Sequence, residues 1–187
     1  VVVNHHLLFA DLSLKQTGFG EVLPGAEVVV IDEAHQMPDT ARQFFSHRVS
    51  AWQLRELNRD TLTAAGHARG ALSVIQQPTA QLKAALVGAT AMFVSLPNKG
   101  DISRIPKAVW PELKKVSSAL TALSEALSSI ADLSKDLGQC AHRAGVLSKD
   151  LMAFLGDDVG HIRWFSHRDG QFGLNLTPLD IAKPIQS

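Results

Sequence analysis

The most regular pattern in the chain is a stripe of apolar residues that begins at Val109, ends at Phe154 and recurs at spacings of four and three. This period predicts a helix with one apolar face, and Ser134 is the polar residue that fills its missing slot. An unbroken helix would be about 65–70 Å long at about 1.5 Å per residue. Gly138 and Gly145 allow a bend or a break, so two antiparallel helices are the alternative. The flanking positions are mostly Ser, Ala and Thr, so we expect the stripe to pack within its own domain and not as an intermolecular coiled coil.

Two short apolar runs, residues 1–3 and 28–31, lie near the start of the chain. Both are β-branched and both end in polar residues, which is typical of strands in a parallel sheet covered on both faces. Residues 7–12 between them predict a helical turn or two, and residues 17–25, with three glycines and one proline, predict a loop. Strand, helix, loop and strand in this order are typical of an α/β nucleotide-binding sheet.

The other segments predict mainly helices and one hairpin. Residues 39–45 follow Pro38 and predict a short helix. Residues 51–96 predict two or three helices, with breaks near Gly66, Gly70 and Pro78. Near the end, two alternating runs flank an Asp-Gly pair at 169–170, which predicts a β-hairpin. The expected fold class is therefore α+β and mostly α.

The composition favours a globular protein, because 45% of the residues are hydrophobic and 19% are charged. Lys plus Arg and Asp plus Glu number 18 each, so a nucleic-acid site would have to be a local basic surface. A single cysteine, Cys140, excludes an internal disulfide and fits a reducing cytosol. No apolar run is long enough to cross a bilayer, so we expect no membrane partner. The chain starts without Met or a basic leader, and we expect it to be a piece of a longer protein.

The motif that carries chemistry is Asp32-Glu33-Ala34-His35, directly after the apolar run 28–31. At the carboxyl end of a buried strand, an Asp can hold Mg²⁺ through water beneath the phosphates of ATP. The adjacent Glu can polarise the attacking water, and the His can sense the γ-phosphate. Two other interpretations are an acidic strand end that caps the next helix and a metal cluster of three histidines. That cluster would be His5, His6 and His35.

Three segments in this order resemble the superfamily 2 helicases related to XPD and DinG, and the DinG/YoaA branch above all. They are residues 4–12 (Asn-His-His-Leu-Leu-Phe-Ala-Asp-Leu), 28–35, and 177–182 (Thr-Pro-Leu-Asp-Ile-Ala). The resemblance implies a helical arch-type domain inserted into a partial RecA-like α/β motor domain. The implied divisions are a partial first motor domain at 1–46, an arch domain at 47–158, and a β-hairpin that returns to the motor domain at 159–187.

The resemblance implies an ATP-dependent 5′→3′ DNA helicase of DNA repair and replication in the bacterial cytosol. Asp32 would be the Mg²⁺ ligand, Glu33 the catalytic base and His35 the coupling residue. Asn4 and His5 would lie near the nucleotide, unless they only cap the strand end by hydrogen bonds. The implied cofactors are Mg²⁺, ATP and, in the parent protein, a 4Fe–4S cluster. The implied partners are single-stranded or forked DNA and other repair or replication proteins.

The chain also departs from the family pattern. It contains no Gly-x-x-x-x-Gly-Lys-Ser/Thr loop, the four cluster cysteines would lie upstream of it, and the second motor domain would lie downstream. Cys140 lies on the apolar stripe and is expected to be a core thiol. We therefore expect the chain alone to be inactive. The main alternative is a helical protein-interaction module with a vestigial DEAH motif, which an exposed stripe would favour. A helical-bundle protein with no nucleotide history is a weaker alternative.

Cations and aromatic residues in the arch-like region could contact single-stranded DNA, although each could equally lie on an ordinary solvated helix face. Trp164, which alternates with Arg163 on a predicted strand, is expected in the core. The candidate contacts are Arg48, Arg55, Arg59, Arg69, Lys99, Arg104, Lys107, Lys114 and Lys115, with Trp52 and Trp110 among them.

Overall fold

The fold is described from a computed structural model, which covers residues 2–17, 22–25, 28–37, 40–41, 46–156 and 160–179. The chain divides into two compact units. The first contains residues 1–47, 160–162 and 177–187, and the second contains residues 48–159 and 163–176. Within the described residues, no helix is both long and apolar enough to span a bilayer.

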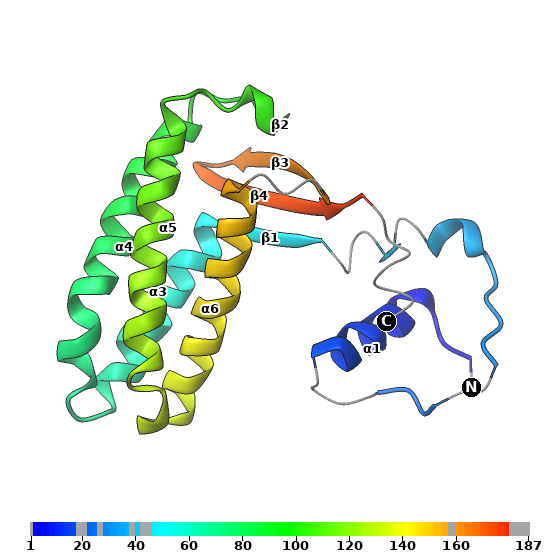
Figure 1. The fold of residues 1–187 in the computed structure, drawn as a ribbon, viewed down its shortest axis with the longest axis horizontal. Coiled ribbons are helices and arrows are strands. Elements are labelled where there is room, and N and C mark those ends of the chain that lie inside the picture. Colours follow the sequence, from blue (N-terminus) through cyan, green and yellow to red (C-terminus); the bar gives the residue numbers. More distant parts are fainter. Residues whose placement is uncertain are drawn as a thin grey trace. The chain divides into compact units, whose positions relative to one another are not determined.

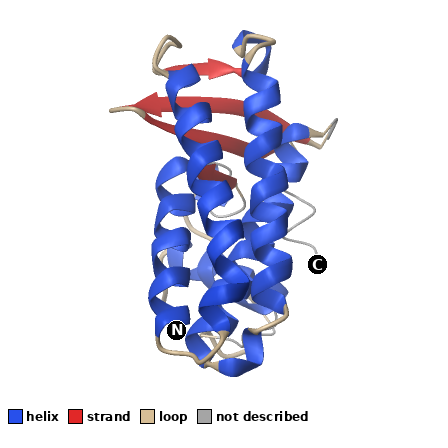
Figure 2. Ribbon diagram, turned by 90° about the vertical axis from the view of Figure 1, so that its left-hand side faces the viewer, coloured by secondary structure: helices blue, strands red, loops and turns tan. Residues whose placement is uncertain are grey.

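The second unit is built on a bundle of four long helices among its described residues (Figures 1 and 2). Helix α4 packs against α5, α5 against α6, and α3 against both α4 and α6, so the bundle closes on itself. One contiguous apolar core runs through it. The helices are α3 (Ala51–Gly66), α4 (Ala71–Phe93), α5 (Val109–Ser128) and α6 (Lys135–Leu155).

The long apolar stripe forms two helices, α5 and α6, and its members are buried between them and their neighbours. The break lies at residues 129–134, where Ser134 caps α6 by accepting a hydrogen bond from the Leu137 N–H at 3.2 Å. A break at Gly138 or Gly145 was the wrong position, because both lie inside α6. Ser134, the polar residue in the stripe, was the better signal for the break, because a serine hydroxyl accepts a hydrogen bond from a free N–H group at a helix N-terminus. The buried stripe confirms packing within its own domain.

The break between α3 and α4 lies at residues 67–70, as predicted, and Gly70 has the positive φ of 79° that a glycine adopts without strain. The predicted break at Pro78 is wrong, because Pro78 lies inside α4. Proline costs about 3 kcal/mol inside a helix. Ile75 and Leu82, one on each side of it, are fully buried, and their packing offsets that cost.

The described strands form a sheet in the order β1-β4-β3-β2. The predicted hairpin is confirmed as β3 and β4, and Asp169 and Gly170 both have positive φ (50° and 69°), as a tight two-residue turn requires. Strand β2 pairs antiparallel with β3, with Lys99 opposite Ser166. Neither β1 nor β2 was predicted. The bounds are β1 His47–Ser50, β2 Lys99–Asp101, β3 His161–Arg168 and β4 Gln171–Pro178.

The first unit contains helix α1 (His5–Thr17), which is longer than the one or two turns predicted. The Asn4 side-chain oxygen accepts the Leu7 N–H at 2.8 Å and so caps its start. The buried Asp11 carboxylate accepts the N–H groups of Val22 and Leu23 at 2.6 and 2.9 Å. This carboxylate therefore holds the described part of the predicted loop, residues 22–25, against the helix.

The predicted strand 28–31 is not a strand here, and neither are the described residues 2 and 3 of the first apolar run. Val28 and Val30 are 79% and 90% exposed, so the run is not buried. A strand of a parallel sheet needs a hydrogen-bonded neighbour, and no strand is present between residues 2 and 46 in the described part of the chain. The RecA-like sheet therefore remains a prediction. The predicted helix 39–45 lies mostly outside the described residues, with 40–41 helical.

Candidate functional site

A hollow of about 840 Å³ in the first unit brings two sequence motifs together. Its lining includes Asn4, His5, Asp32 and Glu33 together with residues 28–31. The Nε2 atom of His5 lies 2.9 Å from the Asp32 carbonyl oxygen, a hydrogen bond that requires the tautomer with the proton on Nε2. Asn4 and His5 therefore line one hollow with Asp32 and Glu33, and His35 is not part of its lining.

The backbone turns sharply at the acidic motif. One Asp32 carboxylate oxygen accepts the Glu33 N–H at 2.9 Å. Glu33 itself is left-handed (φ 50°, ψ 42°), a conformation that costs a non-glycine residue about 1–2 kcal/mol. The short helix η1 (Ala34–Gln36) follows. Glu33 makes no side-chain capping bond to it. The helix predicted at 39–45, which the acidic strand end would cap, lies mostly outside the described residues.

Glu33 and His35 form a surface pair, with 3.2 Å between a Glu33 carboxylate oxygen and His35 Nδ1. The pair is an ion pair only when His35 is protonated. Because the two side chains are 58% and 72% exposed, the pair contributes less than about 1 kcal/mol to stability. The pair places Glu33, the expected catalytic base, beside His35, the expected coupling residue.

Asn4 caps the start of helix α1, whereas the alternative to nucleotide contact was a cap at a strand end, and Asn4 also lines the hollow. The alternative of a metal site formed by three histidines is wrong. The part of the chain that the structure describes holds no group of three His, Cys, Asp or Glu side chains able to bind a metal. His5 bonds to a carbonyl oxygen and His35 to Glu33.

The residues of the hollow fit a hydrated Mg²⁺ better than they fit a whole nucleotide. The Asp32 carboxylate uses one oxygen for the Glu33 N–H, which leaves the other for a cation-bound water. No glycine-rich phosphate loop occurs in the sequence, so this chain has no cradle for the triphosphate.

A 4Fe–4S cluster does not fit this chain. It needs several cysteine thiolates, and the sequence has one cysteine. Cys140 is 4% exposed in the helical core, and burial raises the pKa of its thiol. The expectation of a core thiol is confirmed.

Three of the candidate DNA contacts are engaged within the second unit. Arg55 donates to Gln171 at 2.5 Å and to Thr90 at 3.1 Å, so it joins α3 to β4 and α4. The Arg59 guanidinium pairs with the Glu56 and Asp60 carboxylates. Lys115 pairs with Glu112 at 2.7 Å. A cation with a carboxylate partner is a weaker attractor for phosphate.

The aromatic residues differ in exposure. Trp52 is 61% exposed, whereas Trp110 is partly buried against the helical core. Trp164 is half-buried and not in the core as predicted, because its ring lies on the outer face of the sheet with Lys99 Nζ 4.3 Å from its centroid. The strand alternation that places Phe165 inward places Trp164 outward.

Arg48 and Trp52 line a second hollow together with Arg168, which was not among the predicted contacts. Its position beside the Asp-Gly turn of the hairpin was the available signal. The other cationic candidates are exposed but spread over separate segments of the second unit. They are Arg69, Arg104, Lys107 and Lys114.

Comparison with known proteins identifies relatives over nearly the whole chain. No family model matches. A protein of Haemophilus influenzae named ATP-dependent DNA helicase YoaA is 33% identical over 193 residues, and an Escherichia coli protein of the same name is 31% identical over 188 residues. Each comparison covers 97% of this chain and 29% of the relative, so the chain spans less than a third of the length of these curated relatives. The resemblance to the DinG/YoaA branch is thus confirmed, and the chain is the homologue of one segment of these YoaA proteins.

Proposed function

We propose that the chain is a segment of an ATP-dependent 5′→3′ DNA helicase, with a hydrolysis motif in its first unit and a DNA-facing arch in its second. The main support is the 31–33% sequence identity, over 97% of the chain, to two proteins named as ATP-dependent DNA helicases. The acidic motif and the shared hollow of His5 and Asp32 support an ATP role for the first unit.

In this proposal Asp32 holds the water shell of Mg²⁺ and Glu33 accepts a proton from the attacking water. His35, paired with Glu33 at 3.2 Å, couples the state of the site to neighbouring elements. Mg²⁺ neutralises charge on the β- and γ-phosphates when it is bound. The phosphate cradle, the iron–sulfur cluster and the second motor domain come from parts of the longer protein outside this chain. DNA repair or replication proteins are its proposed partners, in the bacterial cytosol.

The test uses the full-length protein that contains this segment. Glu33→Gln removes the general base and keeps the shape of the side chain, so ATP hydrolysis stimulated by single-stranded DNA should fall at least about 100-fold. Glu125→Gln, at an exposed carboxylate on α5, is the matched control and should leave turnover unchanged. Retained turnover in Glu33→Gln would contradict the proposed role.

The direction of unwinding is tested with two duplexes that differ in which end carries the single-stranded tail. Duplexes with a single-stranded 5′ tail should be unwound, whereas duplexes with only a 3′ tail should not. The 187-residue chain alone should show no turnover above its Glu33→Gln variant, because it lacks the phosphate loop. Turnover by the isolated chain would overturn that expectation.

The interaction-module alternative receives no support from the second unit. Its expected sign was an exposed apolar stripe, and the stripe along α5 and α6 is buried.

A further inference from the structure

The sheet of the second unit has one face on the core and one face turned away from it. Phe165 of β3 and Phe172 of β4 pack on Phe93, with ring centroids 5.9 and 4.8 Å away. Side chains alternate along a strand, so Ser166 and Arg168 of β3 lie on the opposite face. On β1, Val49 is in the core, and Arg48 therefore lies on this outer face too.

Gly173 leaves a bare site at the centre of this outer face. A Cβ atom there would lie 2.8 Å from the Ser166 hydroxyl oxygen and 3.1 Å from both Nε and Nη2 of Arg48. The contact with Ser166 is shorter than real Cβ atoms make, and the contacts with Arg48 are tight, so a larger residue would shift the serine side chain and press on the guanidinium. Glycine thus leaves room for the Arg48 guanidinium and the Ser166 hydroxyl beside β4.

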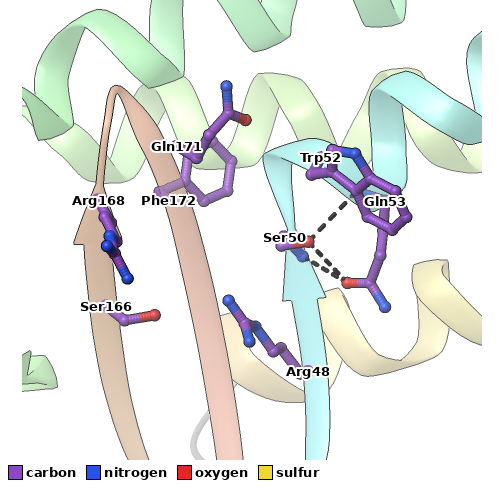
Figure 3. A pocket seen from close by; sticks show the side chains of 8 residues that line it. All are labelled: Arg48, Ser50, Trp52, Gln53, Ser166, Arg168, Gln171 and Phe172. Carbon is purple, nitrogen blue, oxygen red and sulfur yellow. Dashed lines mark hydrogen bonds between the residues drawn. The ribbon is translucent and has the colours of Figure 1, made fainter.

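Arg48, Trp52, Ser166, Arg168 and Gln171 line an open hollow of about 360 Å³ over this site (Figure 3). Figure 3 shows the Arg48 and Arg168 side chains on either side of β4, with Trp52 beyond β1. None of the residues that line the hollow is acidic. The Asp169 carboxylate lies 3.4 Å from Arg168 Nε, but both side chains are about nine-tenths exposed, so solvent screens that pair.

Two polar groups at the rim are held in place by internal hydrogen bonds. The Ser50 hydroxyl accepts the Gln53 N–H at 3.2 Å, and the Gln53 side chain accepts the Ser50 N–H at 2.9 Å. This capping box fixes the first turn of α3, which carries Trp52. Arg55 donates to the Gln171 side chain at 2.5 Å and orients it. The exposed indole therefore stands on an ordered turn.

From this arrangement we infer that the hollow binds one nucleotide unit of single-stranded DNA. The guanidinium groups of Arg48 and Arg168 hold a phosphate, and the Trp52 ring stacks on the base. The inference rests on the proposed DNA function and assigns it a specific contact site. A guanidinium fork matches phosphate geometry, and base stacking on an aromatic ring is independent of sequence. A base in a duplex is already stacked, and an acidic peptide would give the indole no partner, so a single strand fits best.

The test measures binding of a fluorescein-labelled oligothymidylate to the 187-residue chain by anisotropy at several salt concentrations. Trp52→Ala should weaken binding about tenfold through lost stacking. Arg48→Lys keeps the charge without the fork and should still weaken binding several-fold. Arg168→Ala should reduce the slope of log affinity against log salt by about 0.7, the value for one phosphate contact. Arg143→Ala on α6, which removes an arginine paired with Asp60 at 2.7 Å, is the matched control and should bind as the unmodified chain does.

Gly173→Val puts a side chain against the Ser166 hydroxyl and the Arg48 guanidinium and removes no cation from the chain, so it should also weaken binding. Far-UV circular dichroism identifies any variant that has lost its fold, and Trp52→Ala and Arg48→Lys, at exposed side chains, then provide the test. Absence of binding by the unmodified chain would overturn the inference. Unchanged affinity in Trp52→Ala and Arg48→Lys would also overturn it, as would equal competition by polyglutamate.

The same variants in the full-length protein separate this inference from the proposed function. If the full-length protein hydrolyses ATP and unwinds DNA but the variants bind the oligonucleotide normally, the contact site is wrong and the helicase proposal stands. If the full-length protein neither hydrolyses ATP nor unwinds DNA while the variants lose affinity, the helicase proposal fails and the contact site stands.

Discussion

The two units of the chain differ in how far their apolar segments are buried. In the second unit, the stripe along α5 and α6 is buried in a bundle whose helices all lie within the chain. In the first unit, the four consecutive apolar residues 28–31 are 40–90% exposed, although Phe9, Ala41 and Pro178 are buried. Both patterns predict burial, and only one of them achieves it in this chain.

The difference follows from where helices and strands find hydrogen-bond partners for their backbone N–H and C=O groups. A helix makes its hydrogen bonds within itself and needs neighbours only for its apolar face. A parallel strand needs a partner for the backbone itself, and a sheet of such strands is covered by helices on both faces. The chain spans 29% of its relatives, and we expect the partner strands of 28–31 to come from the rest of such a protein. The site around the acidic motif at 32–35 would then be completed by other segments of such a longer protein.

The largest effect on stability should come from the bundle core. Leu123 of α5 is fully buried, so Leu123→Ala removes buried methyl groups and leaves a cavity. The free energy of unfolding of the second unit should fall by about 2–5 kcal/mol. Urea titration followed by helical circular dichroism measures it. A loss below about 1 kcal/mol would mean that the bundle is not packed as described.

Cys140 probes the same core through its reactivity. Burial raises the pKa of its thiol, so the reactive thiolate is scarce in the folded state. Alkylation by iodoacetamide should be at least about 100-fold slower in the native chain than in urea, because it requires opening of the bundle. Stability should also fall as the pH rises above the ordinary thiol range, since the unfolded state releases this proton more readily. Equal labelling rates with and without urea would show that α6 does not close the core.

A smaller effect should come from the cap that divides the stripe. Ser134→Ala removes the acceptor of the Leu137 N–H and should cost about 1 kcal/mol. Ser134→Asp keeps an acceptor and serves as the matched control, with stability close to that of the unmodified chain. If Ser134→Ala left the urea midpoint unchanged, the break at residues 129–134 would depend on packing and not on the cap.

The smallest effect should be in the exposed run of the first unit. Val29 is 60% exposed, so Val29→Ala should change the stability of this chain by less than about 0.5 kcal/mol. In the full-length protein, where a buried strand is expected, the same change should cost about 1.5 kcal/mol or more. Comparison of thermal melts of the two proteins measures the difference. Equal, small effects in both would refute the expected strand.

The regular parts of the fold could be predicted from the sequence because their signals are local. Asp169 and Gly170 identify the hairpin, and the period of the stripe identifies helix. Strand β2 could not be predicted, because its residues, Lys99–Asp101, pair with β3 more than sixty positions away in the sequence. The break predicted at Pro78 was wrong because the packing of α4 against distant segments outweighs the low helix propensity of proline.

For the candidate sites, the chemistry could be predicted from residue types. Asp32, Glu33 and His35 lie in one motif, and the phosphate loop and the cluster cysteines are absent from this chain. Which residues meet became clear from the folded structure. It joined His5 to Asp32 across 27 positions, engaged Arg55 with Gln171 and Thr90, and brought Arg168 into one hollow with Arg48 and Trp52. Residue types and short spacings define what a side chain can do, whereas contacts between distant segments depend on the packing of the whole unit.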